Sequence, residues 1–206
     1  MAALFYTRAV GDGWSENPEA DTRRGTDLAR RAMQVAGDDP VIIANAANAL
    51  ACFGEDVGTM AALVDHALAL NPSFARGWYI NGCLRLWAGQ PDIAIQHAEA
   101  SLRLSPRARV GAVRTVIGAA HLLSRRFEEA VPELLLAIEE TPNFPTPYRH
   151  LAACYAHVGR LDDARDVIKR LRALTSAVMP PIMYLRNGEH RQLVLSGLAM
   201  AAGDAE

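Results

Sequence analysis

Residues 145–176 read PTPYRHLAACYAHVGRLDDARDVIKRLRALTS, and this stretch decides the fold. Its first half has apolar residues at i, i+3, i+4 and i+7, the spacing of one helix face: Tyr148, Leu151, Ala152 and Tyr155. After Gly159 a second helical pattern follows: Leu161, Ala164, Ile168 and Leu171. Because the connection between the two patterns is short, we expect two antiparallel helices.

The same unit returns along the chain. A small turn residue followed by proline recurs, and the prolines stand 34 and 36 residues apart: Pro72, Pro106 and Pro142. A step of 34 residues back from Pro72 reaches Asp38, where the same turn is present without its proline. The sequence therefore predicts a repeated pair of helices.

These units resemble tetratricopeptide repeats (TPR). Three units carry the repeat pattern in register: Trp78, Gly82, Gly89, Ala94 and Pro106; then Ile117, Gly118, Phe127, Ala130, Ala137 and Pro142; then Tyr148, Leu151, Ala152, Tyr155, Gly159 and Ala164. The small residues allow two helix axes to approach closely. The resemblance implies an all-α fold, a right-handed TPR superhelix (α-solenoid) of about five helix pairs plus a C-terminal capping helix.

We expect a single solenoid domain over residues 1–206. It is divided into a degenerate first repeat at 1–40, repeats at 41–74, 75–108, 109–144 and 145–176, and a cap at 177–206. In the first repeat the expected helices cover 2–10 and 27–36, with a long polar loop between them. In the cap, Pro180-Pro181 is expected to break the chain before a last helix at 189–202.

A second resemblance concerns the order of segments. Four segments carry it, at 67–87, 105–109, 143–149 and 186–198. In this order they look like the C-terminal TPR array of a bacterial family. In that family the array follows an adenylate/guanylate cyclase-type or a winged-helix regulatory domain. Gly188 departs from that family, where proline is expected after Asn187. This resemblance implies a regulatory or docking part. No cyclase catalytic segment is present, so the resemblance carries no cyclase activity over to this chain.

In TPR proteins the first helix of each pair lines a concave groove. Seven residues fall on the implied groove positions and are expected to contact a partner: Asn45, Arg76, Tyr79, Trp87, Thr115, Arg149 and His157. Aromatic, Arg and Asn groups together suit the grip of a peptide. The alternative is that Tyr79 and Trp87 are ordinary packing residues.

Residues 100–127 contain no acidic residue and six arginines: Arg103, Arg107, Arg109, Arg114, Arg125 and Arg126. One interpretation is a positive surface that recruits an acidic segment or a phosphate-bearing ligand. The other is neutralisation across the helix pair by the acidic residues that follow: Glu128, Glu129, Glu133, Glu139 and Glu140.

The sequence lacks the motifs of an enzyme, such as Gly-x-Ser-x-Gly, a phosphate loop or His-Glu-x-x-His. His150, Cys154 and His157 share one helical stripe, but zinc would need a fourth ligand. We therefore expect no catalytic residue, no cofactor and no metal.

Composition limits the remaining function classes. A net charge of −2 argues against a binder that neutralises nucleic-acid phosphates, and no apolar run is long enough to span a membrane. The start of the chain does not resemble a signal peptide, so we expect a cytoplasmic location.

The leading hypothesis is a protein–protein interaction scaffold that binds a partner peptide or domain in the concave groove. The alternative is a C-terminal regulatory domain of a multidomain bacterial cyclase or transcriptional regulator, acting within its own chain. No cap is obvious at the N-terminal end, which suggests either a longer protein or a homodimer through that end.

Overall fold

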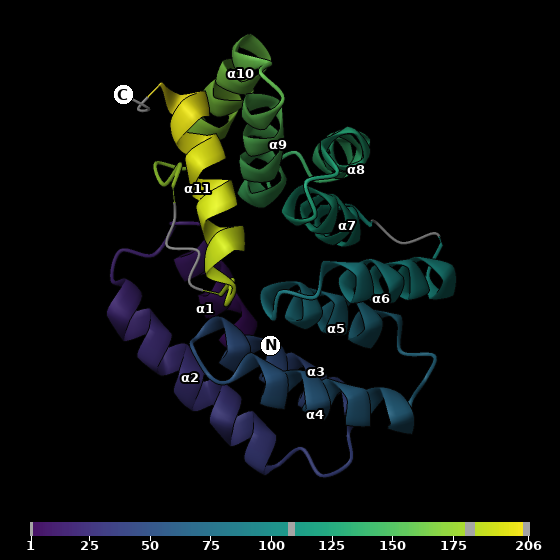
Figure 1. The fold of residues 1–206 in the computed structure, drawn as a ribbon. Coiled ribbons are helices and arrows are strands. Elements are labelled where there is room, and N and C mark those ends of the chain that lie inside the picture. The colour runs from purple at the N-terminus through teal and green to yellow at the C-terminus, as the bar shows by residue number, and fades with distance from the viewer. Residues whose placement is uncertain (1, 107–109, 180–183, 204–206) are drawn as a thin grey trace.

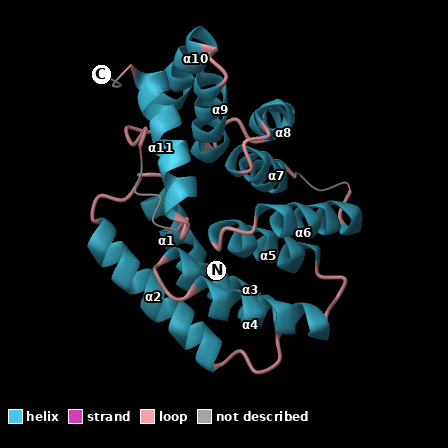
Figure 2. Cartoon of the chain, viewed as in Figure 1, coloured by secondary structure: helices cyan, strands magenta, loops and turns pink. Residues whose placement is uncertain are grey.

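The computed structural model describes residues 2–106, 110–179 and 184–203. In these residues the chain forms eleven α-helices and no strand (Figures 1 and 2). The prediction of an all-α fold is confirmed. Pro180-Pro181, Arg107 and Arg109 lie outside the described residues.

Ten of the helices form five consecutive pairs, and each helix packs against its partner in the pair. The first helices of the pairs are α1 (Ala2–Gly11), α3 (Pro40–Cys52), α5 (Ala75–Trp87), α7 (Gly111–Leu123) and α9 (Pro145–His157). The second helices are α2 (Pro18–Gln34), α4 (Val57–Leu70), α6 (Pro91–Leu104), α8 (Phe127–Glu140) and α10 (Leu161–Arg172). One further helix, α11 (Gly188–Ala202), follows the last pair.

Helix α2 is longer than the helix predicted at 27–36. It begins at Pro18, which needs no hydrogen-bond acceptor for its nitrogen at the first helical position. The side chain of Asn17 accepts a hydrogen bond from the Ala20 N–H at 3.1 Å and caps the helix. The loop between the first two helices is therefore shorter than the sequence pattern indicated.

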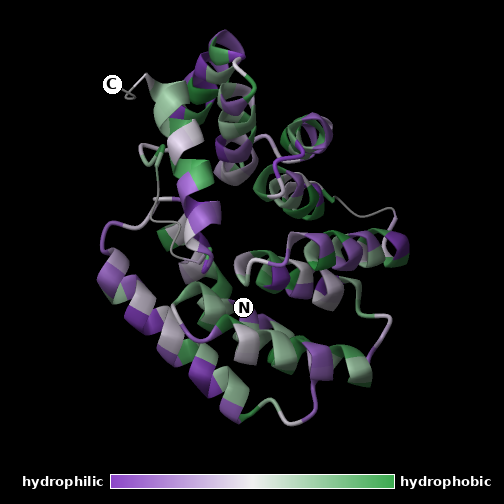
Figure 3. Ribbon diagram, viewed as in Figure 1, coloured by the Kyte–Doolittle hydropathy of each residue, from purple (hydrophilic) through white to green (hydrophobic). Residues whose placement is uncertain are grey.

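Small residues lie where the two helices of a pair approach most closely. A Cβ on Gly82 of α5 would lie 3.2 Å from the carbonyl oxygen of Ala94 on α6. A Cβ on Gly118 of α7 would lie 2.6 Å from the Leu134 side chain of α8. The large apolar side chains then pack around these contacts. Figure 3 shows hydrophobic and hydrophilic residues interspersed along the helices, as in amphipathic helices.

The helix pairs follow an arc, and α11 lies across the opening of this arc (Figure 1). Helix α11 packs mainly on α9 and also contacts α7 and α10. Helix α1 packs on α2 and α3, and its Arg8 guanidinium lies 5.2 Å from the ring centre of Phe144, just before α9. The first and last pairs of the array are therefore in contact, which the repeat pattern did not predict.

No described helix has both the length and the apolar composition of a membrane-spanning segment.

Candidate functional site

Described residues between α10 and α11 contact the first helices of the pairs and the turn after α1. We call the described part of this segment, residues 174–179 and 184–187, the strap. At one end of the strap, the Trp14 indole N–H donates to the Leu174 carbonyl at 3.4 Å. At the other end, the backbone N–H of Arg186 donates to the carbonyl of Trp87, the last residue of α5, at 2.8 Å. The strap therefore connects the two ends of the array with its middle.

Three successive strap residues occupy the C-terminal ends of α3 and α5. The Tyr184 ring packs against Trp87, with ring centres 5.5 Å apart. The side chain of Leu185 is 2% exposed. The Arg186 guanidinium donates to the carbonyl of Ala51 at 3.0 Å and to that of Glu55 at 3.2 Å. We call this region, Ala51–Glu55 with Trp87 and Gly89, the strapped edge of the groove.

The electrostatics of the strapped edge favour a cation. The last carbonyls of a helix lack partners within the helix and carry its negative dipole end. Burial of Tyr184 raises the pKa of its phenol to about 12, although the nearby Arg149 guanidinium acts to lower it. The Tyr184 hydroxyl is therefore neutral, and the guanidinium of Arg186 supplies the charge that meets the Ala51 carbonyl near the end of α3 and the Glu55 carbonyl in the turn that follows.

A buried contact connects the N-terminal pair, the last pair and the strap. The Arg149 guanidinium of α9 donates to the carbonyl of Ala177 at 2.7 Å and lies 3.8 Å from the Asp12 carboxylate. The Thr175 hydroxyl donates to the Asp12 carbonyl at 2.9 Å. Burial raises the pKa of Asp12, while Arg149 and Arg8 act to lower it. Both charged side chains are about 5% exposed, so this ion pair is buried. We call the contact of Asp12 with Arg149 and Thr175, which joins the two ends of the array, the clasp.

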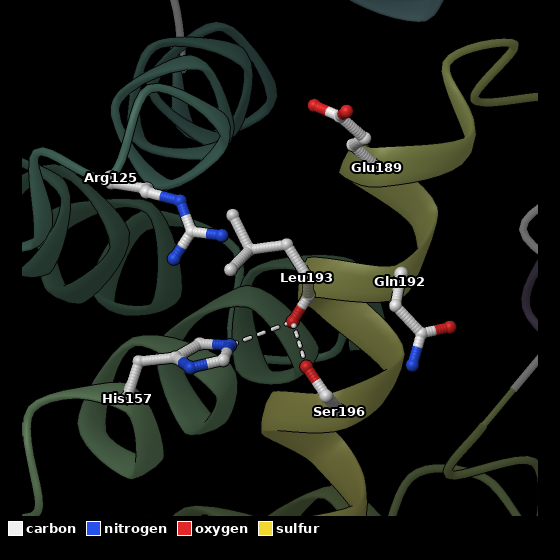
Figure 4. Close-up of a pocket in the computed structure, with 6 residues that line it drawn as sticks. All are labelled: Arg125, His157, Glu189, Gln192, Leu193 and Ser196. Carbon is white, nitrogen blue, oxygen red and sulfur yellow. Dashed lines mark hydrogen bonds between the residues drawn. The ribbon is translucent and has the colours of Figure 1, made fainter.

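Helix α11 covers the concave side of α9. A Cβ on Gly197 would lie 2.8 Å from both the Cα and the Cβ of Ala153, so only glycine fits at this approach. The His157 Nε2 lies 2.7 Å from the Leu193 carbonyl, which also accepts the Ser196 hydroxyl at 3.1 Å (Figure 4). An open pocket of about 280 Å³ lies beside these residues, lined by Arg125, His157, Glu189, Gln192, Leu193 and Ser196.

A different part of the groove faces solvent. In α5, Arg76 is exposed, and its Nε donates to the Asn45 Oδ1 of α3 at 3.0 Å. Val41, one turn before Asn45, is 46% exposed. We call these three residues, near the N-terminal ends of α3 and α5, the open edge of the groove.

The seven predicted contact residues thus have unequal positions. Asn45 and Arg76 are brought together, and Arg76 is exposed while Asn45 is partly buried. Tyr79 and Trp87 are mostly covered, and the neighbouring Cys83 together with burial raises the pKa of Tyr79 well above its usual range. The remaining three contact the chain itself.

Of these three, Thr115 is 4% exposed and donates its hydroxyl to the Gly111 carbonyl at 2.8 Å. Arg149 is 4% exposed within the clasp, and His157 contacts α11. In this structure the chain's own atoms cover Thr115 and Arg149, so neither presents its side chain to a partner.

The arginine-rich segment is partly paired with acidic side chains. Arg114 contacts Glu133 at 3.0 Å and Glu140 at 3.4 Å. Arg126 contacts Asp92 at 2.7 Å. For Arg114 and Arg126 the structure therefore favours neutralisation over ligand recruitment.

Metal ligation finds no geometric basis in the described part of the chain, where no three His, Cys, Asp or Glu side chains converge. His150 and Cys154 are buried between helices, and burial lowers the pKa of His150 to about 4, with a further contribution from Arg149. A neutral imidazole in this position is a packing residue.

Sequence reasoning missed Tyr184, Leu185 and Arg186. The available signal was that Tyr184 is the only aromatic residue after Tyr155 and stands beside an arginine in a segment without helical periodicity. Such a segment has no pattern that places it, so the sequence could not predict what it contacts.

Several solved structures resemble this arrangement of helices. YrrB, described as a TPR protein with an unusual peptide-binding site, is 21% identical, with a TM-score of 0.55 over 87% of this chain and 94% of YrrB. MamA from Desulfovibrio magneticus RS-1 is 17% identical, with a TM-score of 0.58 over 84% of this chain and 94% of that one. This chain has the TPR fold.

A MamA from AMB-1 shows the same likeness, with 21% identity and a TM-score of 0.56 over 82% of this chain and 97% of that one. No protein-family model and no curated protein sequence matches the chain. At these identities the likeness establishes the TPR solenoid fold alone.

Proposed function

We propose that this chain is a protein–protein interaction scaffold that holds a peptide or protein partner at the open edge of its groove. The observation that carries the proposal is the hydrogen bond that fixes the exposed Arg76 against Asn45 on the neighbouring first helix. YrrB, which shares the fold, is described as having a peptide-binding site, and this supports a peptide partner here.

The chemistry of the open edge suits a peptide backbone or an acidic side chain. A guanidinium has five N–H donors, and Asn45 takes the one on Nε, so Arg76 is oriented and can still donate to a partner. Val41 adds exposed apolar area on the same helix as Asn45. A polar anchor beside apolar surface is the usual composition of a peptide-recognition site.

The test compares affinity capture by the wild-type chain and by Arg76→Glu, with retained proteins identified by mass spectrometry and then titrated in purified form. The matched control is Arg24→Glu, which makes the same charge change at an exposed position of α2. We expect one partner to bind the wild type and Arg24→Glu, and to bind Arg76→Glu at least about tenfold more weakly. Equal affinity of that partner for all three chains would contradict the open edge as its site.

The repeat boundaries, the cytoplasmic location, the exclusion of nucleic acid and membrane, and the regulatory role within a longer bacterial chain stay predictions. The homodimer also stays a prediction. Phe5 of α1 is 69% exposed and would be the first residue to replace in a light-scattering experiment.

A further inference from the structure

The strapped edge already holds a peptide segment, which is the chain's own. Tyr184, Leu185 and Arg186 are consecutive, non-helical, and each makes a different contact. An aromatic ring packs on Trp87, an aliphatic side chain is buried, and a guanidinium meets helix-end carbonyls. The environment of each residue therefore suits one kind of side chain: aromatic at 184, aliphatic at 185 and cationic at 186.

The backbone of this segment is also held. The Arg186 N–H donates to the Trp87 carbonyl, so the strap is fixed both by its main chain and by its side chains. A Cβ on Gly89 would lie 3.3 Å from the Asn187 side chain, which shows how closely the strap approaches the turn after α5. The partners of the Tyr184 ring and of Arg186, which are Trp87, Ala51 and Glu55, belong to α3, α5 and the turn after α3, and they would meet the same sequence from another chain equally well.

We propose that the strapped edge is a recognition site for an extended aromatic–aliphatic–arginine segment, and that such a segment of a partner protein replaces residues 184–186 there. This inference rests on the scaffold function proposed above and adds a second site with a defined ligand chemistry. The Ala51 carbonyl near the end of α3 and the Glu55 carbonyl in the next turn select the arginine, because a guanidinium supplies a donor to each and a positive charge at the negative end of α3.

A tethered ligand competes strongly with a free one. A segment joined to its own site by a short connection acts at an effective concentration of about 1 mM. A free peptide therefore binds the wild-type chain weakly, and it binds better when the strap loses a contact that the peptide can supply. Removal of the Arg186 side chain creates this situation, since the peptide then brings the missing guanidinium.

The experiment uses a fluorescein-labelled peptide with the sequence of residues 184–189, Tyr-Leu-Arg-Asn-Gly-Glu, and the full chain. Binding to the wild type, Arg186→Ala and the control Arg172→Ala, which changes an exposed arginine of α10, is measured by fluorescence anisotropy. We expect Arg186→Ala to bind at least about tenfold more tightly than the other two, the change that loss of a charge-assisted hydrogen bond implies. A peptide with glutamine in place of its arginine should lose this gain.

Equal binding of the peptide to Arg186→Ala and to the wild type, or equal binding of both peptides to Arg186→Ala, would overturn the proposal. Circular dichroism shows whether Arg186→Ala folds. If it does not fold, Tyr184→Ala is used in its place. Hydrogen exchange in the unaltered chain gives a second measurement: saturating peptide should speed exchange of the Arg186 amide, and unchanged protection would also overturn the site. A negative result for the peptide would not change the dependence of partner capture on Arg76. The two proposals can therefore be contradicted independently.

Discussion

The open edge and the strapped edge lie on the same two helices and yet offer different surfaces. At the open edge, the exposed Arg76 of α5 donates a hydrogen bond to the partly buried Asn45 of α3. At the strapped edge, the C-terminal ends of these helices are covered by Tyr184, Leu185 and Arg186. The comparison shows that access to the groove depends on where the chain goes after its last repeat, and not on the repeats alone.

The largest expected effect comes from breaking the clasp that holds the strap. Arg149→Met leaves the buried Asp12 carboxylate with only the exposed Arg8, at 3.7 Å, as its cation, so we expect the free energy of unfolding to fall by about 3 kcal/mol. Urea unfolding followed by circular dichroism measures the loss. The double variant Asp12→Leu/Arg149→Met should recover most of it, because it removes both buried charges; a single variant as stable as the wild type would show that the clasp carries no energy.

The covered side of α9 should also be sensitive to acid. His150 has a pKa of about 4 in the folded chain against 6.5 in the unfolded chain, so the unfolded state binds more protons between these values. Stability should therefore fall as the pH falls from 6.5 to 4, by up to about 3 kcal/mol for this group. Urea unfolding at pH 7 and pH 4.5 tests this.

The matched variants for this experiment are His150→Gln and His66→Gln, the second at an exposed position of α4. His150→Gln should lose the part of the acid sensitivity that His150 contributes, and His66→Gln should keep it. Burial also lowers the pKa of His97, His121 and His190, but these groups are present in both variants. Asp12 has a raised pKa and acts in the opposite direction, but it is present in both variants and cancels in their difference. The same acid sensitivity in both variants would contradict a buried neutral His150.

A smaller effect is expected where α11 covers α9. Gly197→Ala places a methyl group 2.8 Å from Ala153, so α11 must shift, at a cost of about 2 kcal/mol. Gly188→Ala is the control, because its Cβ would meet nothing closer than Arg191 at 4.0 Å. The melting temperature and the hydrogen exchange of α11 are measured for Gly197→Ala and Gly188→Ala. Equal melting temperatures of the two variants would mean that α11 is not closely packed against Ala153.

The smallest effect is expected at the open edge. Arg76→Ala removes an exposed hydrogen bond to Asn45, and we expect the free energy of unfolding to change by less than about 0.5 kcal/mol. Urea unfolding of this variant beside Arg149→Met checks the contrast between an exposed and a buried arginine. A loss above about 1 kcal/mol would assign Arg76 a structural role and weaken its assignment as a binding residue.

Much of the fold could be predicted because its signals are local. The periodicity around Tyr148 and Leu151, and the small residues Gly82 and Ala94, determine which faces are buried and how closely helices pack. The groove positions Asn45 and Arg76 followed from the repeat register. Thr115 and Arg149 followed from the same register, but their burial depends on contacts that the register does not contain.

The sequence by itself determined a series of helix pairs, since each pair is specified by residues within about 34 positions of one another. Only the tertiary structure decided which half of the groove is open. Arg186 reaches Ala51 across 135 positions and Thr175 reaches Asp12 across 163, from a segment that has no helical period. The physical reason is that local periodicity specifies which face of a helix is buried, whereas closure of the array depends on a few long-range hydrogen bonds and one buried ion pair that only the folded chain brings together.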